Sequence, residues 1–269
     1  MAVTLSNNIR ALSRQERIVQ HLLLHASASV TELAEALHVS SWTIRRDLSA
    51  LEGRGLLERR YGKALVAESG RYESFTSSHP ADEERTLRSK TAIGRAAARL
   101  VQPGQHVALS AGSTMLEVAR ALRSRNVPCR VVTNALNIAI ELSQASAVRV
   151  TCSGGEVDGD YYTLNGPTAE RVLSGYYFDL AIIGVSGVTL REGLTVNSQM
   201  NAVALSTMLD HSKRVVVVAD ARKFGEVRFA HLGALEHIDV LVTDTAPPPD
   251  LADYFEASGI EVVVADRPA

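Results

Sequence analysis

The sequence of 269 residues has few of the features that mark secreted, membrane-bound or disulfide-rich proteins. Its two cysteines, Cys129 and Cys152, are too few for a disulfide framework and lack metal-ligand spacing, so we expect small buried thiols in a reducing compartment. No apolar run approaches the roughly 20 residues that a membrane-spanning helix needs. The first ten residues also lack the charged-then-apolar order of a secretory signal. We therefore expect a cytoplasmic protein with no membrane partner.

Common cofactor and metal motifs are missing as well. The sequence contains neither a Walker loop nor a GxGxxG motif, and its eight histidines have no metal-like spacing. We therefore assign no cofactor and no metal. The composition, with 46% hydrophobic and 22% charged residues, is typical of a folded globular protein.

The net charge of −2 conceals an uneven distribution of charge along the chain. Residues 1–67 hold nine Lys and Arg against six Asp and Glu, whereas the remaining residues hold 19 against 24. Within residues 45–63 alone, six basic residues accompany three acidic ones. A local excess of positive charge is suited to contact the phosphates of a nucleic acid. The front of the chain is therefore the part to examine for DNA binding.

Capping residues and apolar spacing predict three helices in this front part. Ser13 and Glu16 form a capping box, which predicts a first helix from about residue 14 to residue 25. Thr31 is the expected cap of a second, short helix, and Ser40 is the expected cap of a third. The inward-facing residues of the second helix are expected to be Leu33, Ala34 and Leu37.

The third helix separates an apolar face from a basic one. Its core-facing residues repeat at i, i+4 and i+7 and are Ile44, Leu48 and Leu51. The outward residues are then Ser41, Trp42, Arg45, Arg46 and Ser49. Gly53 and Gly55 are expected to end the helix. The segment LLERRYGKALVA that follows predicts a two-stranded hairpin, or wing, which turns at Gly62 and Lys63.

A short helix, a tight turn and a helix with a basic outer face together have a shape that enters the major groove of DNA. There, Arg45 or Arg46 can bond guanine O6 and N7 in a bidentate manner. Alternatively, both arginines face solvent or pair with Asp47 and Glu52. The basic wing favours DNA binding through Arg59, Arg60 and Lys63. Trp42 either contacts a thymine methyl or sugar, or props the helix against its neighbour.

A polar stretch separates this module from the rest of the chain. Residues 68–78 have no usable apolar period, which is typical of an exposed connector. We predict a DNA-binding domain at 1–67, a linker at 68–80 and a larger domain at 81–269. The larger domain is expected to begin with a helix from about residue 82 to residue 100. The residues on the inward face of this helix are expected to be Ile93, Ala97 and Leu100.

Short β-branched segments then alternate with helical stretches. The segments are HVALS, RVVT, VRVTC, LAIIG, VVVVA, VLVTD and IEVVVA. Strands that are apolar on both faces and alternate with helices predict a largely parallel sheet covered on both sides. The expected fold class is α/β, with an N-terminal winged helix-turn-helix and a larger C-terminal domain built on a mostly parallel sheet flanked by helices.

Ligands of open parallel sheets bind where the strands end and the loops begin, and several such ends here are polar. Gly112, Ser113 and Thr114 open a helix, so they offer backbone amides, two hydroxyls and the positive end of a helix dipole to a phosphate. The same turn also suits an ordinary helix cap. Lys223 adds a positive charge. The other polar strand ends carry Thr133, Asn134, Ser153, Gly155, Ser186, Gly187 and Asp220.

The N-terminal string RQERIVQHLLLHASASVTELAEALHVSSWTIRRDLSALEGRGLL resembles the winged helix-turn-helix of the DeoR family of bacterial transcriptional regulators. The block from Ser40 to Leu48 is the most specific part of the resemblance. It implies that the third helix enters the major groove. With the wing included, the predicted contacts to double-stranded operator DNA are Ser40, Ser41, Trp42, Thr43, Arg45, Arg46, Arg60 and Lys63. Many members have a Gly pair at the wing tip, where this chain has Gly62 and Lys63.

The segment from Glu84 to Asp244 resembles the effector-sensing domain of the same family, through VTN at 132–134, the glycines at 154, 155 and 166, GVSG at 184–187 and ADARKFG at 219–225. Such domains are similar in fold to ribose-5-phosphate isomerase and usually sense phosphorylated sugars or related metabolites. The resemblance implies a phosphate site at Gly112, Ser113 and Thr114. It implies a pocket lined by Asn134, Gly155, Gly184 and Lys223.

Three positions depart from the family pattern. Ser110 stands where an Asp is typical, and Asn201 and Leu205 stand where an acidic residue and a Lys are frequent. Ser110 retains a hydroxyl that can donate to an anion, so we include it among the effector-binding residues. The neutral residues remove a carboxylate of the kind that acid/base chemistry at carbon requires.

These observations predict a DNA-binding transcriptional regulator, a repressor of carbohydrate genes, that responds to a small phosphorylated metabolite and is not an enzyme. Because operators are often symmetric, we expect a homodimer or homotetramer, with effector sensing and oligomerisation both in the domain at 81–269. The alternative is a sugar-phosphate isomerase-like enzyme with an accessory DNA-binding module, whose acid/base candidates are Asp220 and Lys223. A scaffold without any ligand is a third possibility.

Overall fold

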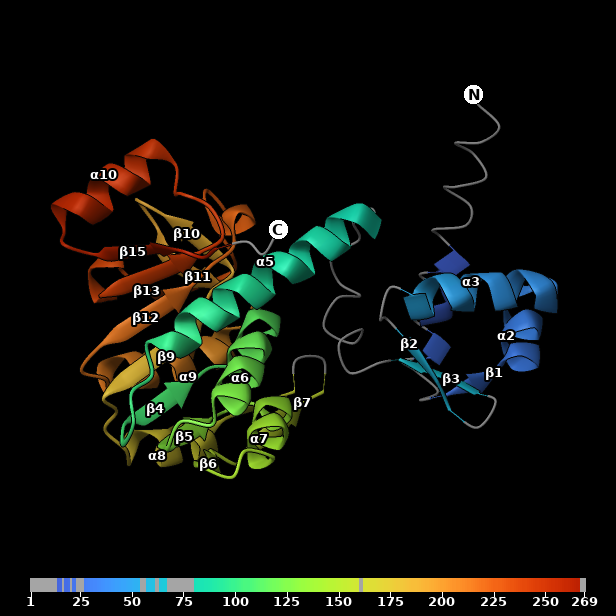
Figure 1. The fold of residues 1–269 in the computed structure, drawn as a ribbon, viewed down its shortest axis with the longest axis horizontal. Helices are drawn as coiled ribbons and strands as arrows, with labels where there is room; N and C mark the ends of the chain where they lie inside the picture. Colours follow the sequence, from blue (N-terminus) through green and yellow to red (C-terminus); the bar gives the residue numbers. More distant parts are fainter. Residues whose placement is uncertain are drawn as a thin grey trace. The chain divides into compact units, whose positions relative to one another are not determined.

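The protein divides into two units, Met1–Glu84 and Arg85–Ala269, each with its own core. The computed structural model is drawn in Figure 1. It describes residues 14–15, 17–19, 21–22, 27–53, 57–60, 63–66, 80–159 and 162–266. Both cysteines lie in the second unit, Cys129 buried and Cys152 partly so, and both are free thiols. Within the described residues, no helix is long and apolar enough to cross a membrane.

The first unit consists of helices and a small antiparallel sheet. Residues 14–15, 17–19 and 21–22 are helical, and the later helices are α2 (Val30–Leu37) and α3 (Ser41–Gly53). The sheet has the order β1-β3-β2, and its strands are β1 (Ala28–Ser29), β2 (Leu57–Arg60) and β3 (Lys63–Val66). The predicted capping box of Ser13 and Glu16, Gly55 and the predicted linker lie outside the described residues.

Apolar residues of all these elements meet in one core. The predicted inward residues of α2 and α3 are confirmed, because each is at least 92% buried: Leu33, Ala34, Leu37, Ile44, Leu48 and Leu51. They pack with Ile18 and Leu22 of the first helical segment and with Leu57 and Ala64 of the sheet. This core sets which face of α3 remains outside.

The cap of α2 and the turn of the wing differ from the predictions. Ser29, not Thr31, caps α2: its hydroxyl accepts from the amide of Glu32 at 3.2 Å, and the Glu32 carboxylate accepts from the Ser29 amide at 2.6 Å. Lys63 does not stand in the turn but begins β3, where it pairs with both Arg60 and Ser29. The pairing with β1 joins residues far apart in the chain, so local turn propensity did not reveal it.

The second unit contains a seven-stranded sheet in which every pairing is parallel. Its order is β15-β14-β12-β9-β4-β5-β6. All seven predicted strands are present, as β4 (His106–Leu109), β5 (Cys129–Thr133), β6 (Val148–Cys152), β9 (Leu180–Gly184), β12 (Val215–Val218), β14 (Val240–Thr243) and β15 (Glu261–Val264). The predicted α/β class is confirmed.

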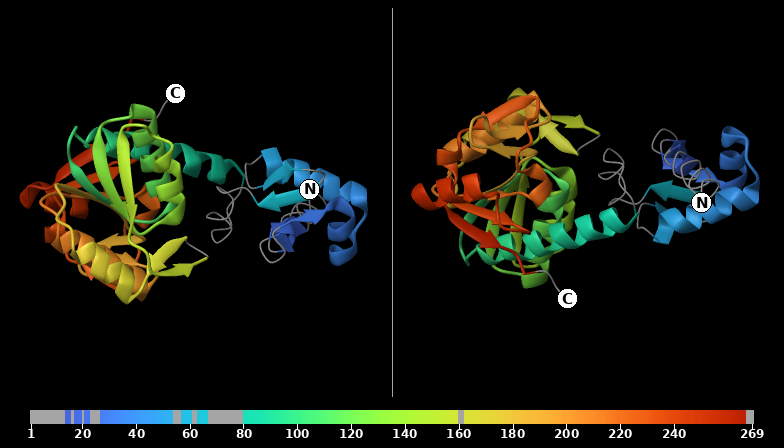
Figure 2. Two further views of the ribbon diagram at one scale, coloured as in Figure 1. Left: turned by 90° about the horizontal axis from the view of Figure 1, so that it is seen from below. Right: turned by 90° about the horizontal axis from the view of Figure 1, so that it is seen from above.

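Helices cover both faces of this sheet, as Figure 2 shows from two further directions. One face packs against α5 (Pro80–Arg99), α6 (Ser113–Arg125) and α7 (Leu136–Ser143). The other packs against α8 (Pro167–Ser174), α9 (Gln199–Asp210) and α10 (Pro249–Ala257). Short 3-10 helices span Ala221–Lys223 and Leu235–His237. Each face therefore contributes to a separate apolar core.

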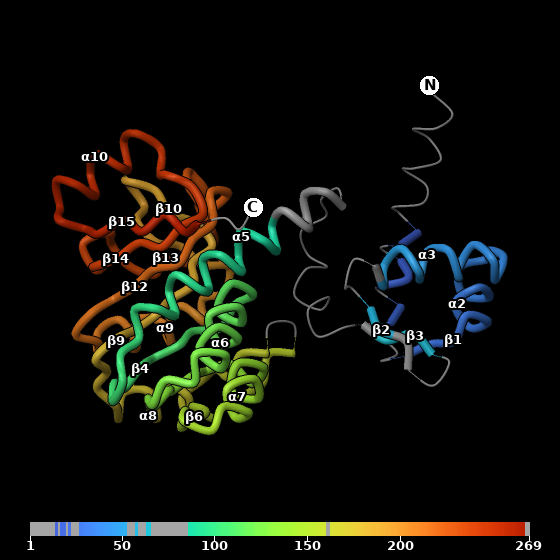
Figure 3. Tube along the Cα trace, viewed as in Figure 1, coloured from blue at the N-terminus to red at the C-terminus, as the bar shows by residue number. Residues whose placement is uncertain are grey.

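Two small antiparallel sheets were missed by the sequence analysis. One has the order β10-β11-β13, with β10 (Gly187–Thr189), β11 (Gly193–Val196) and β13 (Ala230–Gly233). The other pairs β7 (Glu156–Asp158) with β8 (Thr163–Asn165). The trace in Figure 3 follows both. Their segments EVD, TLN, GVT, GLTV and AHLG lack the continuous β-branched runs of the central strands, so the sequence does not mark them.

A glycine brings α5 and α6 into backbone contact. A Cβ at Gly94 would lie 2.6 Å from the carbonyl carbon of Glu117, closer than real Cβ atoms approach. The Thr91 hydroxyl donates to the Glu117 carboxylate at 3.0 Å, and Arg125 donates to the carbonyl oxygen of Ala98. The two helices therefore run side by side in the same direction (Figure 1).

Gly94→Ala is expected to lower the free energy of unfolding by about 1–3 kcal/mol, because the added methyl group forces α5 and α6 apart. Helix propensity alone predicts the opposite sign, a gain of about 1 kcal/mol. Chemical denaturation of the full chain measures the difference. The control is Gly159→Ala, since a Cβ there meets no atom within 4 Å. Equal stability of both variants would contradict the close contact.

Candidate DNA-contacting helix and effector site

The start of α3 is fixed by its predicted cap. The Ser40 hydroxyl accepts a hydrogen bond from the Thr43 amide at 3.2 Å and lies 2.9 Å from the Thr43 hydroxyl. Both side chains remain accessible at the amino end of the helix. A side-chain oxygen at this position satisfies one of the amides that the first turn leaves without an intrahelical partner. Ser40 and Thr43 therefore fix where the helix begins.

The outer face of α3 carries the predicted contact residues. Ser41, Arg45 and Arg46 are exposed, and the Trp42 side chain is 69% exposed. Ile44, Leu48 and Leu51 occupy the core on the opposite side. A tryptophan that props a helix against its neighbour is buried at the contact, so the exposure of Trp42 favours the outward interpretation.

Asp47 holds α3 to the first helical segment. Its carboxylate is 97% buried and accepts hydrogen bonds from the Arg14 guanidinium through both oxygens, one at 3.1 Å, and from the Gln15 amide at 3.3 Å. The hydrogen bond with Asp47 raises the pKa of Arg14. The acidic residue within the basic helix therefore pairs with Arg14. The alternative in which Asp47 pairs with Arg45 or Arg46 is not what the structure shows.

Of the two predicted DNA contacts in the wing, Lys63 and Arg60, only Lys63 has a side chain within the described part of the structure. Lys63 is exposed at the start of β3. The backbone of Arg60 lies in β2, and its side chain is outside the described part.

The second candidate site lies at the carboxyl ends of the central strands. The turn after β4 places Gly112 before α6 with φ +138°, a backbone conformation that favours glycine. Gly112 supplies no side-chain cap, so the first amides of α6 are available to an anion. Ser113 and Thr114 are partly exposed at this turn. The predicted phosphate turn therefore has the expected geometry.

Ser110 and Gly184 join the ends of β4 and β9. The Ser110 side chain is completely buried; its hydroxyl accepts from the Gly184 amide at 2.9 Å and donates to the carbonyl oxygen of Ala111 at 3.3 Å. A Cβ at Gly184 would lie 3.2 Å from Met115. The hydrogen bond between these two residues therefore holds the ends of β4 and β9 together beside the predicted phosphate-binding turn.

Asparagine side chains supply the neutral part of the site. Asn134, after β5, is fully buried and donates from Nδ2 to Oδ1 of Asn201 at 3.2 Å. Its own Oδ1 accepts no hydrogen bond from the described residues, and neither does Oδ1 of Asn165, which is 97% buried. A backbone hydrogen bond from Leu164 to Asn134 brings the two segments together. Buried amide oxygens without a partner suit the hydroxyl donors of a ligand.

One predicted pocket residue, Gly155, and one position that departs from the family pattern, Leu205, have mainly packing contacts. A Cβ at Gly155 would lie 2.4 Å from the carbonyl oxygen of Asn165, so a glycine is required where this loop crosses β8. Leu205 is fully buried in the core between α9 and the sheet.

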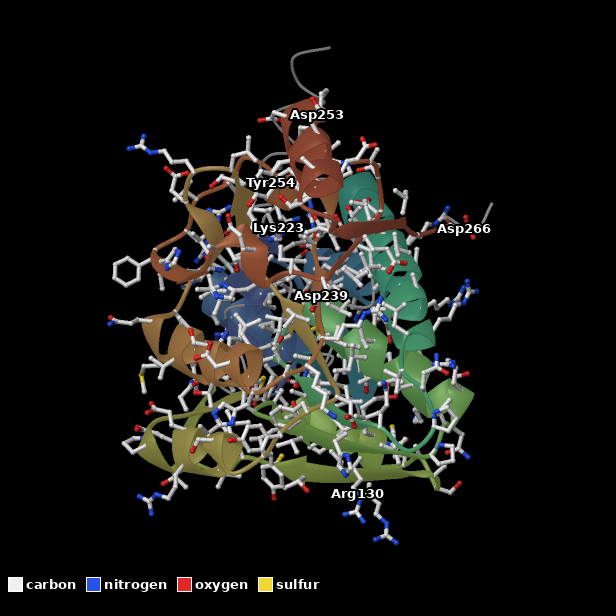
Figure 4. All side chains as sticks on the ribbon, turned by 90° about the vertical axis from the view of Figure 1, so that its left-hand side faces the viewer. Arg130, Lys223, Asp239, Asp253, Tyr254 and Asp266 are labelled. Carbon is white, nitrogen blue, oxygen red and sulfur yellow. The ribbon has the colours of Figure 1, made fainter. Side chains whose placement is uncertain are left out.

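Lys223 lies half-buried after β12, on the side of the sheet formed by the C-terminal strands, and Figure 4 shows it well away from Arg130 of β5. Burial lowers the pKa of Lys223, and the nearby Asp220 carboxylate opposes the shift. Burial also acts to raise the pKa of Asp220, but hydrogen bonds and the positive charge of Arg222 lower it overall. Asp220 is therefore an ionised partner of Arg222 that also caps the 3-10 helix.

Lys90 is a functional candidate that the sequence analysis missed. It is 92% buried on α5, and its charge acts on Lys223 to lower the pKa. Because Gly94 of α5 contacts Glu117 of α6 and the helices are parallel, the backbone of Lys90, one turn earlier, lies level with the start of α6. The sequence feature that could have indicated this candidate is the position of Lys90, three residues before Ile93 on the apolar face of α5.

Adjacent strands thus bring most predicted effector residues to one edge of the sheet. In the order β12-β9-β4-β5, these strands lead to Lys223, Gly184, Gly112 and Asn134 respectively. Lys223 lies at this edge together with the buried carboxylates of Asp220 and Asp244, whereas the asparagine side chains are neutral. Among the described residues, no group of three His, Cys, Asp or Glu side chains could hold a metal ion.

Comparison with known proteins bears on both sites. The DeoR-like helix-turn-helix domain matches residues 14–70, and the DeoR C terminal sensor domain matches residues 85–245. The putative aga operon transcriptional repressor of Escherichia coli O157:H7 is 31% identical over 254 residues, which cover 93% of each chain. The HTH-type transcriptional regulator GlpR of Haloferax volcanii is 35% identical over 251 residues, which cover 93% of this chain and 96% of that protein.

Similarity to solved structures is weaker. Ribose 5-phosphate isomerase A from Methanocaldococcus jannaschii aligns with 52% of this chain and 55% of its own, at 16% identity and a TM-score of 0.39. A likeness at that level establishes neither fold nor activity. The two matched domains and the full-length relatives do establish the family: the chain is a member of the DeoR family of transcriptional regulators, with a helix-turn-helix domain followed by a sensor domain.

Proposed function

We propose that this protein represses genes of carbohydrate use by binding operator DNA through α3 and that a phosphorylated sugar or sugar acid controls the binding. The observation that carries the proposal is the division of α3 into a buried apolar face and an exposed face with Trp42, Arg45 and Arg46. Such a helix can place guanidinium groups against guanine edges. The exposed Ser41 and Lys63 are suited to phosphate contacts beside it, and Arg60 completes the proposed wing contact.

The effector site supports a ligand with two chemically different ends. The amides at Ser113 and Thr114, with Lys223, favour a phosphate. The Oδ1 atoms of Asn134 and Asn165 favour hydroxyl groups, because an amide oxygen only accepts hydrogen bonds. Ser110 and Gly184 fix the floor between strands, and Gly155 lets the loop after β6 pass close to β8. A phosphorylated polyol matches both ends.

Control of DNA binding requires that the effector bind the DNA-competent and DNA-incompetent forms with different affinity. Two helix-turn-helix modules are needed for a symmetric operator, so the working form is a homodimer or a homotetramer in the cytoplasm. Asp220 is engaged with Arg222 and serves as a structural anion. The proposed role of the sensor domain is therefore binding without turnover.

Replacing Arg45 and Arg46 together by Ala is expected to weaken operator binding at least about tenfold, because each base-contacting arginine contributes about 1–3 kcal/mol. Operator DNA selected from a random duplex library serves as the probe in a gel-shift titration at fixed salt. A lost phosphate contact would also reduce the salt slope by about one.

The matched control for this double variant is Arg191→Ala, an exposed arginine of the sensor unit beside Glu192. It changes the charge in the same direction without touching α3. Trp42 is the single tryptophan of the chain, so its emission provides a second measurement of the same contact. Unchanged affinity in the arginine variant, with unchanged Trp42 emission on adding operator, would remove α3 from the DNA interface.

Lys223→Met is expected to reduce the affinity for a phosphorylated sugar by about tenfold or more, since a hydrogen bond to a charged group contributes about 1.5–3 kcal/mol. A thermal-shift screen of pentose and hexose phosphates, sugar acids and the unphosphorylated sugars measures it. At about 100 times its dissociation constant, a ligand stabilises the fold by about 2.7 kcal/mol.

Lys213→Met is the control for the effector test, because Lys213 is exposed and pairs with Asp179 at the amino ends of β9 and β12, opposite the carboxyl ends that form the candidate site. The variant should keep the wild-type response. A phosphorylated ligand that stabilises the Lys223→Met protein as much as wild type would place the anion elsewhere. If no sugar phosphate stabilises any variant, the proposed effector class is wrong.

A further inference from the structure

A row of basic residues crosses the amino edge of the seven-stranded sheet, at the opposite end of the strands from the candidate effector site. In the register of the sheet, Arg130 of β5 lies between His106 of β4 and Arg149 of β6. His106 is the single exposed residue of β4, and Arg130 is the single exposed residue of β5. Because neighbouring strands are about 4.8 Å apart, the Cα atoms of the three residues lie within about 10 Å.

The two arginines share one face of the sheet, and we call them the arginine pair. Their sequence neighbours Val131 and Val150 pack on the core under α5, α6 and α7. Successive side chains of a strand point to opposite faces, so Arg130 and Arg149 point to the other face. Both are exposed there, and Figure 4 shows Arg130 extending away from the sheet. The arginine pair is therefore open to a partner.

No residue in the described part of the chain balances the charge of the arginine pair. Neither guanidinium group forms an ion pair with a described residue. Asp179 stands next to His106 in the row, but it accepts hydrogen bonds from the His106 amide at 3.0 Å and from Lys213 at 2.9 Å, which lower its pKa to about 2. Two like charges side by side without a counter-charge repel each other. The arginine pair thus does not stabilise the sheet.

Structural roles account for the neighbouring arginines but not for both members of the pair. The other three arginines of residues 120–149 have partners: Arg120 bonds Glu117, Arg123 bonds Glu141, and Arg125 bonds backbone carbonyls. A charge on an edge strand hinders unwanted pairing with another chain, which is a sufficient reason for Arg149 on β6. Arg130 lies on an interior strand, so that reason does not apply to it.

The surroundings of the arginine pair favour a chain of phosphates as its partner. A single small anion on an open sheet face remains in water, where its attraction to the pair is weak. The core of a protein interface is apolar, yet none of the large exposed hydrophobic residues of the described chain lies in β4, β5 or β6. The exposed residues beside the pair are polar and include Asn126, Ser146 and Thr151. Arginine with Ser, Thr and Asn is the usual set of residues that contact a nucleic-acid backbone.

We propose that the arginine pair binds the phosphate backbone of DNA beyond the base pairs that α3 reads. This contact rests on the proposed function, because α3 holds the DNA first. A second contact made by the same chain is then intramolecular, so it adds affinity even when it is weak by itself. The contact positions the DNA and reads no sequence. It gives the sensor unit a direct part in DNA binding.

The test compares two duplexes, the selected operator trimmed to the shortest length that binds and the same operator extended on each side by about three helical turns. Wild type should bind the extended duplex more tightly. Arg130→Gln combined with Arg149→Gln should weaken binding to the extended duplex by about tenfold or more at about 0.1 M salt, and should reduce its salt slope by about two. Binding of this variant to the trimmed operator should equal that of wild type. Gel-shift titration over a range of salt concentrations measures both quantities.

The matched control is Arg95→Gln combined with Arg99→Gln, which changes two exposed arginines one turn apart on α5, over the opposite face of the sheet. It removes the same charge and should bind both duplexes as wild type does. Arg130→Lys combined with Arg149→Lys keeps the charge and should keep most of the salt slope. Thermal melting tests a structural role, since loss of two stabilising residues lowers the melting temperature and removal of two repelling charges does not.

The outcomes separate this contact from the proposed function. If wild type binds neither duplex, both are wrong. If wild type binds both duplexes and the glutamine variant of the pair binds the extended one equally well, only the DNA contact is wrong, and an acidic protein surface becomes the partner to test. An equal loss of binding in the α5 control assigns the effect to net charge and also overturns the contact. The α3 variant weakens binding to both duplexes, so its result is independent of the arginine pair.

Discussion

The common direction of the seven sheet strands is the constraint on which the sensor site depends. Because every pairing in this sheet is parallel, the carboxyl ends of β12, β9, β4 and β5 meet at one edge. Residues separated by more than a hundred positions, such as Gly112 and Lys223, are thereby brought to the same side. The hydrogen bond from the Gly184 amide to Ser110 then fixes the spacing of the two central strand ends. The positions of Lys223 and of the asparagine side chains at this edge follow from the arrangement of the strands.

The elements that could be predicted from the sequence are those that depend on residues close together in the chain. Seven β-branched segments became the seven strands, since a strand buried on both faces must be apolar throughout. The faces of α3 were equally predictable, because the period of Ile44, Leu48 and Leu51 determines which residues point outward. The Gly112 turn was predicted for the same reason, as a strand followed by a small-residue turn and a helix.

The missed features depend on partners distant in sequence. Lys63 begins a strand because β1 pairs with it, and Asp47 is neutralised by Arg14 from a different helical segment. Lys90 became a candidate only when the contact of Gly94 with Glu117 placed α5 beside α6. Each of these residues can be read from the sequence, but the distant residues that it contacts in the fold cannot. Ser29 and Thr31, two positions apart, both offer a hydroxyl as the cap of α2, and the glutamate three positions after Ser29 decides for Ser29.

Helix α9 offers a short physical route between the effector site and the outer surface. Asn201 bonds Asn134, whose own amide oxygen is buried and has no partner among the described residues. A ligand hydroxyl that donates to that oxygen fixes the orientation of the Asn134 amide, and through Nδ2 it fixes Asn201 on α9. Met200 and Val203 lie within one turn of Asn201 on the outer side. Because a helix moves largely as a rigid unit, a ligand that repositioned Asn201 would also move the exposed residues on the outer side of α9, without any change of fold.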